Sequence, residues 1–130
     1  MSDGSVKGAL RLSKGVWLFA PDDTELLWRV HLSPAPDPAG FFSKHMSVRL
    51  RVRVLDVKSA AGAKATIQPT TGVPERVVGT LHRDQSGVFV DVGACSFWLD
   101  GVGAQPEAGS VEVDVDVAGG VVCQVLTTIG

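Results

Sequence analysis

Two segments of this sequence carry charged residues in regular rows, and these rows are the side chains most able to do chemistry. Ser47 to Val57 reads SVRLRVRVLDV, and Ser110 to Val117 reads SVEVDVDV. In both segments a charged residue alternates with a valine or leucine, so the charges share one face of an extended chain. The basic row consists of Arg49, Arg51 and Arg53, and the acidic row consists of Glu112, Asp114 and Asp116.

The two rows allow two interpretations. If their strands are neighbours, opposite charges pair across them, and each pair stabilises the sheet by a few tenths to ~1 kcal/mol. If they are not, the acidic row forms an acidic stripe together with Asp22, Asp23 and Glu25. Such a stripe attracts basic proteins and speeds their encounter. The basic row could instead touch nucleic acid, but no aromatic residue interleaves with the arginines, so direct nucleic-acid binding is not expected.

No recognised catalytic or metal-binding pattern is present in the sequence. It lacks GxSxG, HExxH, a P-loop and a complete GxGxxG. His31, His45 and His82 lie on separate segments without ligand spacing. Cys95 could form a thiolate pair with His82, but it sits in an apolar segment where a thiol stays neutral. We therefore expect no enzyme activity, no cofactor and no metal, and we expect Cys95 and Cys123 to be buried thiols.

Length and composition limit the class of protein. The chain has 130 residues, 45% of them hydrophobic, and 12 basic against 14 acidic residues give a net charge of -2. That length fits a single domain over residues 1–130. The balanced charge argues against a generic binder of phosphate backbones. No apolar run reaches the ~18 residues of a membrane span, and the N-terminus lacks the apolar core of a signal peptide, so we expect an intracellular protein without a membrane partner.

Alternation with a period of two predicts strands along most of the chain. Glycine and proline separate the segments at the spacing of an all-β sandwich or barrel. We expect an all-β, antiparallel, jelly-roll-like sandwich of about eight to ten strands. The expected strands are 6–12, 15–20, 25–32, 47–57, 64–68, 75–83, 87–92, 95–100, 110–117 and 121–128.

Two hairpins and one long loop follow from the turn residues. Residues 84–87, Asp-Gln-Ser-Gly, predict a tight turn, and 118–120, Ala-Gly-Gly, predict a three-residue loop between paired strands. The second register would pair Val115 with Cys123 and Val113 with Val125. Residues 33–45 form a loop held extended by three prolines, in which Phe41 and Phe42 either tuck onto the core or dock onto a partner.

Three apolar residues are expected on the outer face of the sheet. The register of the last hairpin turns Val122 and Leu126 outward, and Trp98 lies opposite to the face of Phe97. Apolar groups on a second face usually have a cover, which is either another part of the chain or a neighbouring subunit. Val122, Leu126 and Trp98 are therefore candidates for an interface between copies.

The order of the segments resembles the nucleoplasmin-like core, an eight-stranded jelly roll found in histone chaperones and at the N-terminus of some nuclear prolyl isomerases. The similarity covers about Val16 to Val117. Against the family pattern, the loop at 33–45 looks like an insertion, the loop near Lys58 and Lys64 is basic, and a further strand follows Val117. The motifs that carry the resemblance are Trp17-Leu18-Phe19, Ala60 to Lys64, Arg76 to Leu81, Val88 to Val92, Phe97 to Gly101 and the strand Val111 to Val117.

The resemblance implies a ring of identical subunits, commonly a pentamer, that holds basic histones on an acidic surface in the nucleus. Outward-facing Trp98, Val122 or Leu126 would then contact the neighbouring subunit. Other readings remain open: a nucleic-acid-binding β-barrel that uses the arginine row, a small-molecule-binding barrel, or a protein-interaction sandwich of a different family.

Overall fold

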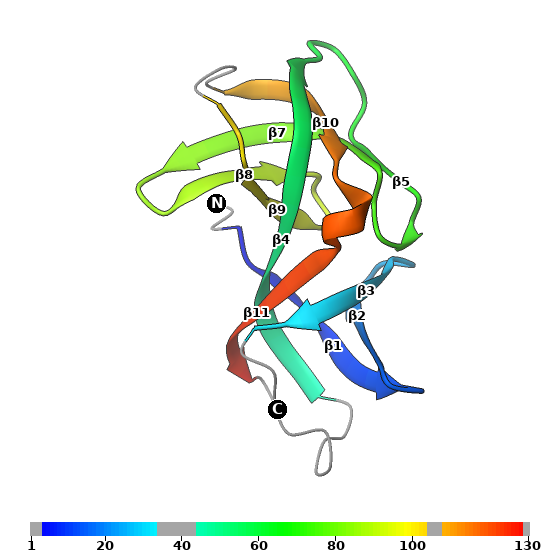
Figure 1. Ribbon diagram of the computed structural model, residues 1–130. Helices are drawn as coiled ribbons and strands as arrows, with labels where there is room; N and C mark the ends of the chain where they lie inside the picture. The colour runs from blue at the N-terminus through cyan, green and yellow to red at the C-terminus, as the bar shows by residue number, and fades with distance from the viewer. Residues whose placement is uncertain (1–3, 34–43, 104–107, 129–130) are drawn as a thin grey trace.

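The structure, a computed structural model, describes residues 4–33, 44–103 and 108–128 of the chain. It confirms the all-β prediction: this part of the chain folds into eleven strands and one 3-10 turn (Figure 1). The elements are β1 (Val6–Ser13), β2 (Val16–Pro21), β3 (Leu27–Leu32), β4 (Lys44–Ser59), β5 (Thr66–Gln68), β6 (Thr71–Gly72), β7 (Arg76–Asp84), β8 (Gly87–Asp91), β9 (Ser96–Asp100), β10 (Gly109–Val115), η2 (Val117–Gly119) and β11 (Val121–Thr128).

The long strand β4 organises the fold because it belongs to two closed circuits of strands. Its first half pairs with β1 on one edge and β11 on the other, and β2 and β3 complete that circuit. Its second half pairs with β10 and β9, and β7 and β8 complete the other circuit. Figure 1 shows the two groups of strands, one on each half of β4. Closure of this kind leaves few strand edges free.

One apolar core fills the interior of both circuits. The predicted alternation in β4 is confirmed, since Val48, Leu50 and Val52 are fully buried. The β-branched side chains of β4 and β10 suit a pleated surface with one buried face. Trp28 of β3 and Phe97 of β9 meet edge to face at 5.5 Å between ring centroids, so the two interiors form a single cluster.

The predicted hairpin between β10 and β11 is wrong. Both strands pair with β4 on the same edge, one after the other: Val115 lies opposite Val54, and Val121 lies opposite Val52. The intervening residues form η2, in which the Asp116 carboxylate accepts a hydrogen bond from the Ala118 amide. The chain therefore continues along β4 instead of folding back, and the expected pairs of Val115 with Cys123 and Val113 with Val125 do not form.

One predicted turn is confirmed, whereas the number and the directions of the strands differ from those expected. The turn at 84–87 is confirmed, with Asp84 opposite Gly87 and its carboxylate accepting from the Ser86 amide. The strand count in the described residues exceeds eight to ten because Thr71–Gly72 adds a two-residue strand. The sheet is not purely antiparallel, since β3 pairs in parallel with β6 and β11, as does β4 with β9.

Most of the proline-rich loop predicted at 33–45, including Phe41 and Phe42, lies outside the described residues, which omit 34–43. Its last two residues, 44 and 45, belong to β4. Within the described ranges, no helix has the length and apolar character needed to cross a membrane.

Candidate functional site

The acidic row on β10 is paired, but with different residues from those expected. Glu112 lies 3.7 Å from the Lys58 ammonium and 3.6 Å from the Arg76 guanidinium. Asp114 lies 3.5 Å from the same guanidinium, and Asp116 caps η2. The arginine row is not opposite these acids, because β10 pairs with the part of β4 that follows Arg53. Basic neighbours therefore already neutralise much of the charge on this row.

The arginine row on β4 packs against Trp98 of the neighbouring strand β9. The Arg49 and Arg51 guanidinium carbons lie 4.6 and 5.6 Å from the centre of the Trp98 ring, and Arg51 also lies 3.4 Å from the Asp100 carboxylate. An aromatic residue thus does interleave with the arginines in space, although none does so in the sequence. Its ring is 1% exposed and cannot stack on an incoming base.

Trp98 lies on the outer face, opposite to that of Phe97, as expected, and it is buried there. Of the two covers that the sequence left open, the structure shows the one within the chain, at Gly4. The Trp98 indole Nε1 donates a 3.0 Å hydrogen bond to the Gly4 carbonyl, and its ring packs 5.0 Å from that of Phe89. The cover is therefore intrachain, and Trp98 is not available for a contact between copies.

Val122 lies on the outer side of β11, as predicted, where it pairs with Arg51 and is half-buried. Leu126 is 40% exposed at an irregularity in the pairing of β11 with β4, which interrupts the alternation on which its predicted face depended. Val122 shares its side with the arginine row and not with the acidic row, because β4 and not β10 is the neighbour of β11.

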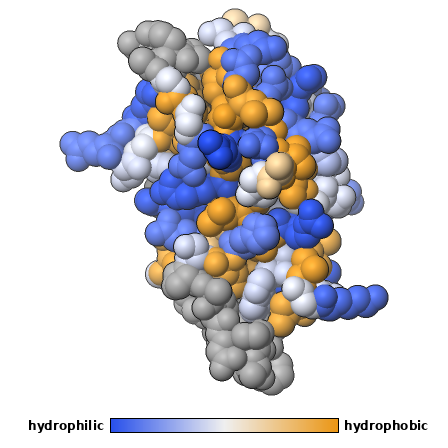
Figure 2. All heavy atoms as spheres, in the orientation of Figure 1, coloured by the Kyte–Doolittle hydropathy of each residue, from blue (hydrophilic) through white to orange (hydrophobic). Residues whose placement is uncertain are grey.

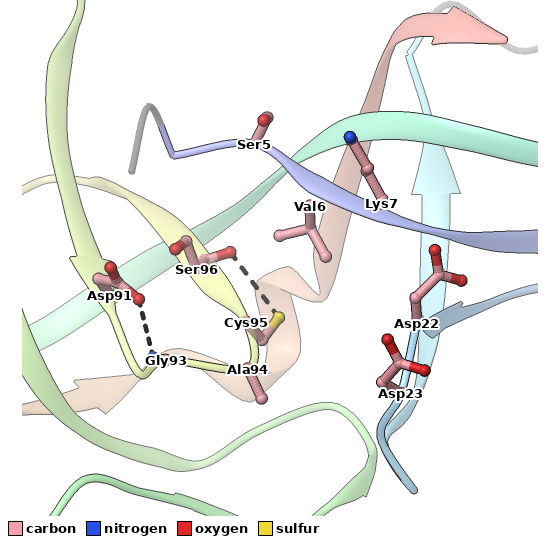
Figure 3. A pocket seen from close by; sticks show the side chains of 10 residues that line it. All are labelled: Ser5, Val6, Lys7, Asp22, Asp23, Asp91, Gly93, Ala94, Cys95 and Ser96. Atoms are coloured by element: carbon pink, nitrogen blue, oxygen red, sulfur yellow. Dashed lines mark hydrogen bonds between the residues drawn. The ribbon is translucent and has the colours of Figure 1, made fainter. Parts of the chain in front are cut away.

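A carboxylate-lined cleft lies between the end of β2 and the turn that joins β8 to β9, beside the first residues of β1 (Figure 3). Its volume is about 390 Å³. Figure 3 shows Asp22 and Asp23 on one side of the opening and Asp91 on the other. We call these three residues and the space between them the acidic cleft. Its full lining is Ser5, Val6, Lys7, Asp22, Asp23, Asp91, Gly93, Ala94, Cys95 and Ser96.

The turn after β2 holds the first two carboxylates in place through local hydrogen bonds. The Asp22 amide donates to the Lys7 carbonyl at 2.9 Å. The Thr24 hydroxyl donates to the Pro21 carbonyl and accepts from the Leu26 amide. Asp23 has a φ of 59°, a left-handed conformation that aspartate tolerates better than most residues. The sequence Pro-Asp-Asp-Thr therefore forms a fixed turn that presents two adjacent acids.

The turn between β8 and β9 fixes the third carboxylate. Asp91 accepts a 2.8 Å hydrogen bond from the Gly93 amide, and the Val92 amide donates to the Cys95 carbonyl. The Cys95 thiol lines the cleft from this turn. Burial raises the pKa of the Cys95 thiol from 9.0 to about 12. The nearby Trp28 indole offsets part of that rise, although the Trp28 Nε1 makes no hydrogen bond of ordinary length. The thiol is therefore neutral at physiological pH and does not act as a thiolate nucleophile.

The acidic cleft keeps a negative balance. The His45 imidazole makes a 2.5 Å contact with the Asp22 carboxylate, and both side chains are about two-fifths exposed. Asp23 and Lys7 make no ion pair within 4.0 Å in the described residues, and Lys7 is the one fully charged base of the lining. Glu25 is exposed on the same turn but does not line the cleft.

The predicted acidic stripe is consequently split into two. Asp22 and Asp23 lie at the end of β2, and the acidic row lies on β10, which is not a neighbour of β2 in the sheet. Asp91 joins the first group and was missed because its segment reads as an ordinary strand. The turn sequence Asp-Val-Gly that follows β8 was the available signal, since an aspartate two residues before a glycine often caps a turn.

The structure does not pair Cys95 with His82. Cys95 belongs to the core, whereas His82 stacks on Phe89 at 4.9 Å on the opposite face of the same strands. Cys123 is buried, as expected, and burial raises its pKa to about 12. Across residues 4–33, 44–103 and 108–128, no group of three or more histidine, cysteine or acidic side chains could hold a metal ion.

No family model, curated protein or solved structure matches this chain.

Proposed function

We propose that this protein is a binding module for basic protein segments and that the acidic cleft is its recognition site. The observation that carries the proposal is the convergence of three carboxylates, Asp22, Asp23 and Asp91, on one opening of about 390 Å³. Their charge exceeds that of Lys7, so the opening favours a lysine or arginine side chain. Hydrogen bonds fix the turns that carry the acids, which lowers the entropic cost of binding.

The acidic row on β10 contributes less to this function than the sequence suggested. Glu112 and Asp114 are each within 4.0 Å of a basic side chain of the same molecule. A partner would have to compete with Lys58 and Arg76 for them. Histone chaperone activity, which the nucleoplasmin-like resemblance implies, is the specific form of the proposal, with the cleft as the site that holds lysine-rich and arginine-rich tails.

A titration with a labelled peptide rich in lysine and arginine tests the proposal. We expect binding at about 50 mM salt that weakens towards about 200 mM as charges are screened. The variant Asp22→Asn/Asp23→Asn/Asp91→Asn should lose at least about tenfold in affinity, which corresponds to about 1.4 kcal/mol. The control variant Glu112→Gln/Asp114→Asn, which removes two carboxylates of the acidic row, should stay within about twofold. Equal losses in the two variants, or no binding at low salt, would disprove the cleft as the site.

We further propose that copies of the chain associate through the exposed C-terminal part of β11. Val125 and Leu126 are 38% and 40% exposed there, and Val125 lies opposite Val48, on the other face from the arginine row. Half-buried Val122 lies earlier on the same strand. Apolar residues gathered at one strand can form a contact that repeats around a ring. Light scattering at low and high micromolar concentration measures the assembly state, and Leu126→Asp should shift it towards the monomer. A monomer at every concentration would rule out this part of the proposal.

A further inference from the structure

A second charged surface lies on the outer side of β3, β11 and β4, away from the acidic cleft. β11 lies between the other two strands, and Val122 pairs with His31 on one side and Arg51 on the other. His31 and Arg51 are therefore two strands apart in one row, about 9–10 Å between backbones. The position of His31 beside the arginine row could not be predicted from the sequence, because it depends on the parallel pairing of β3 with β11. We call the set Arg29, His31, Arg49, Arg51 and Arg53 the basic belt.

Two of the belt's arginines are held in place by the molecule itself. Arg49 lies over the Trp98 ring at 4.6 Å, and Arg51 lies 5.6 Å from the same ring. Trp98 in turn is fixed by its hydrogen bond to the Gly4 carbonyl. A guanidinium that rests on an aromatic face has fewer conformations to lose on binding.

Carboxylates neutralise little of the belt. Asp100 lies 3.4 Å from Arg51 but is itself 58% exposed, and Asp116 follows β10 near Arg53, with its carboxylate bonded to the Ala118 amide. Arg29, His31 and Arg53 are exposed and make no ion pair within 4.0 Å in the described residues. Figure 2 shows this side of the molecule, where hydrophilic and apolar side chains are interleaved over β11 and β4. The acidic row has basic neighbours, whereas the belt keeps most of its charge.

We propose that the basic belt binds the sugar–phosphate backbone of a single-stranded nucleic acid. The arginines of β4 recur every second residue, so their Cα atoms lie about 6.6–6.8 Å apart along the strand, and they suit a partner whose charge also repeats regularly. Guanidinium groups bind phosphate through two parallel hydrogen bonds. A flexible single strand can follow the convex outside of a closed circuit of strands, whereas a stiff duplex meets it at few phosphates.

The same geometry excludes contacts between the belt and the bases of a nucleic acid. Trp98 is buried beneath the arginines and the start of the chain, so its ring offers no face to a base. Binding therefore uses the backbone alone and is independent of base sequence. The overall charge of -2 conceals this surface, because most of the acids that balance it lie away from the belt, although Asp100 and Asp116 lie beside it.

Fluorescence anisotropy with labelled oligomers of deoxythymidine and of deoxyadenosine tests the inference. Both should bind with similar affinity at about 50 mM salt, and the logarithm of the binding constant should fall by about 0.7 per neutralised phosphate for each tenfold rise in salt. Arg29→Ala/Arg53→Ala should weaken binding and reduce that slope by about 1–2. Lys58→Ala/Lys64→Ala removes the same charge far from the belt and should leave the slope unchanged.

Three outcomes would overturn the inference. One is the absence of binding at low salt, another is an equal loss in the two double variants, and the third is tighter binding to a duplex or to polyglutamate than to the single strands. Arg29→Ala/Arg53→Ala should retain full affinity for the basic peptide. The belt and the acidic cleft can therefore fail independently.

Discussion

The two charged rows look equivalent in the sequence, but the molecule satisfies them in different ways. Glu112 and Asp114 on β10 meet the basic side chains of β4 and β7 within 4.0 Å. Arg49 and Arg51 on β4 instead rest on an indole ring, and Arg51 reaches one carboxylate at 3.4 Å. The first row is neutralised by opposite charge, and the second is supported by packing and keeps its charge. The difference teaches that sheet neighbours, and not the row's own residues, decide whether a charged row is free to bind.

The largest expected effect comes from removing the support under the arginine row. Trp98→Ala deletes a fully buried ring, its contact with Phe89 and its hydrogen bond to the Gly4 carbonyl. We expect the free energy of unfolding to fall by about 3–5 kcal/mol, because a large buried side chain is replaced by a cavity. Urea denaturation measures the loss.

Trp98→Phe is the matched control for that experiment. It keeps an aromatic face beneath Arg49 and loses the indole hydrogen bond, which is worth about 1 kcal/mol, together with part of the ring's packing. Its cost should therefore be clearly smaller than that of Trp98→Ala. If Trp98→Ala cost less than about 1 kcal/mol, the arginine row would not depend on the ring, and the contrast between the two rows would disappear.

The strands themselves could be predicted, because alternation is a local property. Ser47 to Val57 falls within β4, and Val48, Leu50 and Val52 are buried as their spacing required. The turn at 84–87 also formed, since aspartate and glycine stood at the positions that such a turn needs. Residue type and spacing were sufficient where the contacts lie within one strand or one tight turn.

The neighbours of the strands could not be predicted in the same way. Alternation fixes which face a side chain takes, but it does not fix which strand lies beside it. Val115 and Cys123 were matched across a hairpin, whereas both strands continue along one edge of β4. The cover over Trp98 comes from Gly4, 94 residues away in the chain. Contacts at such separation depend on how the whole sheet closes.

The candidate site shows the same difference between local contacts and contacts across the sheet. Asp22 and Asp23 were identified as adjacent acids that would extend the acidic row, although the structure places them away from it. Asp91 was not, because its place in the cleft depends on the turn after β8 lying against the end of β2. The cleft forms because the sheet closes, and only the part of it that lies on one turn could be identified in the sequence.

A smaller effect is expected at the segment that covers Trp98. Gly4 has a φ of +79°, and a Cβ built there would lie 2.6 Å from the Trp98 Nε1. Gly4→Ala must therefore displace the segment or the ring, at a cost of about 1–3 kcal/mol in stability. Thermal unfolding combined with tryptophan fluorescence would show both the loss and the greater exposure of the indole.

Gly62→Ala separates the contact from the backbone strain. Gly62 has nearly the same φ, +80°, but an added Cβ there would meet no atom within 4 Å. Its replacement should cost only the left-handed conformation, about 1 kcal/mol. Equal losses at the two glycines would mean that the cover over Trp98 yields freely, and the arginine row would then be less firmly supported than the geometry indicates.

The smallest effect is expected at the acidic row, where removal of the shared partner tests the other half of the comparison. Arg76 lies within 4.0 Å of both Glu112 and Asp114, and its side chain is 54% exposed. Solvent screens such pairs, so Arg76→Ala should reduce the free energy of unfolding by about 0.2–1 kcal/mol, and by less as salt rises from about 50 to about 200 mM. Arg53→Ala removes an exposed arginine without an ion pair and should leave stability unchanged.

The basic peptide should bind Arg76→Ala slightly more tightly, because two carboxylates lose their competitor. A loss of stability comparable to that of Trp98→Ala would mean that ion pairing supports β10 as strongly as packing supports β4. The two rows would then differ in the sign of their charge but not in how strongly they are supported.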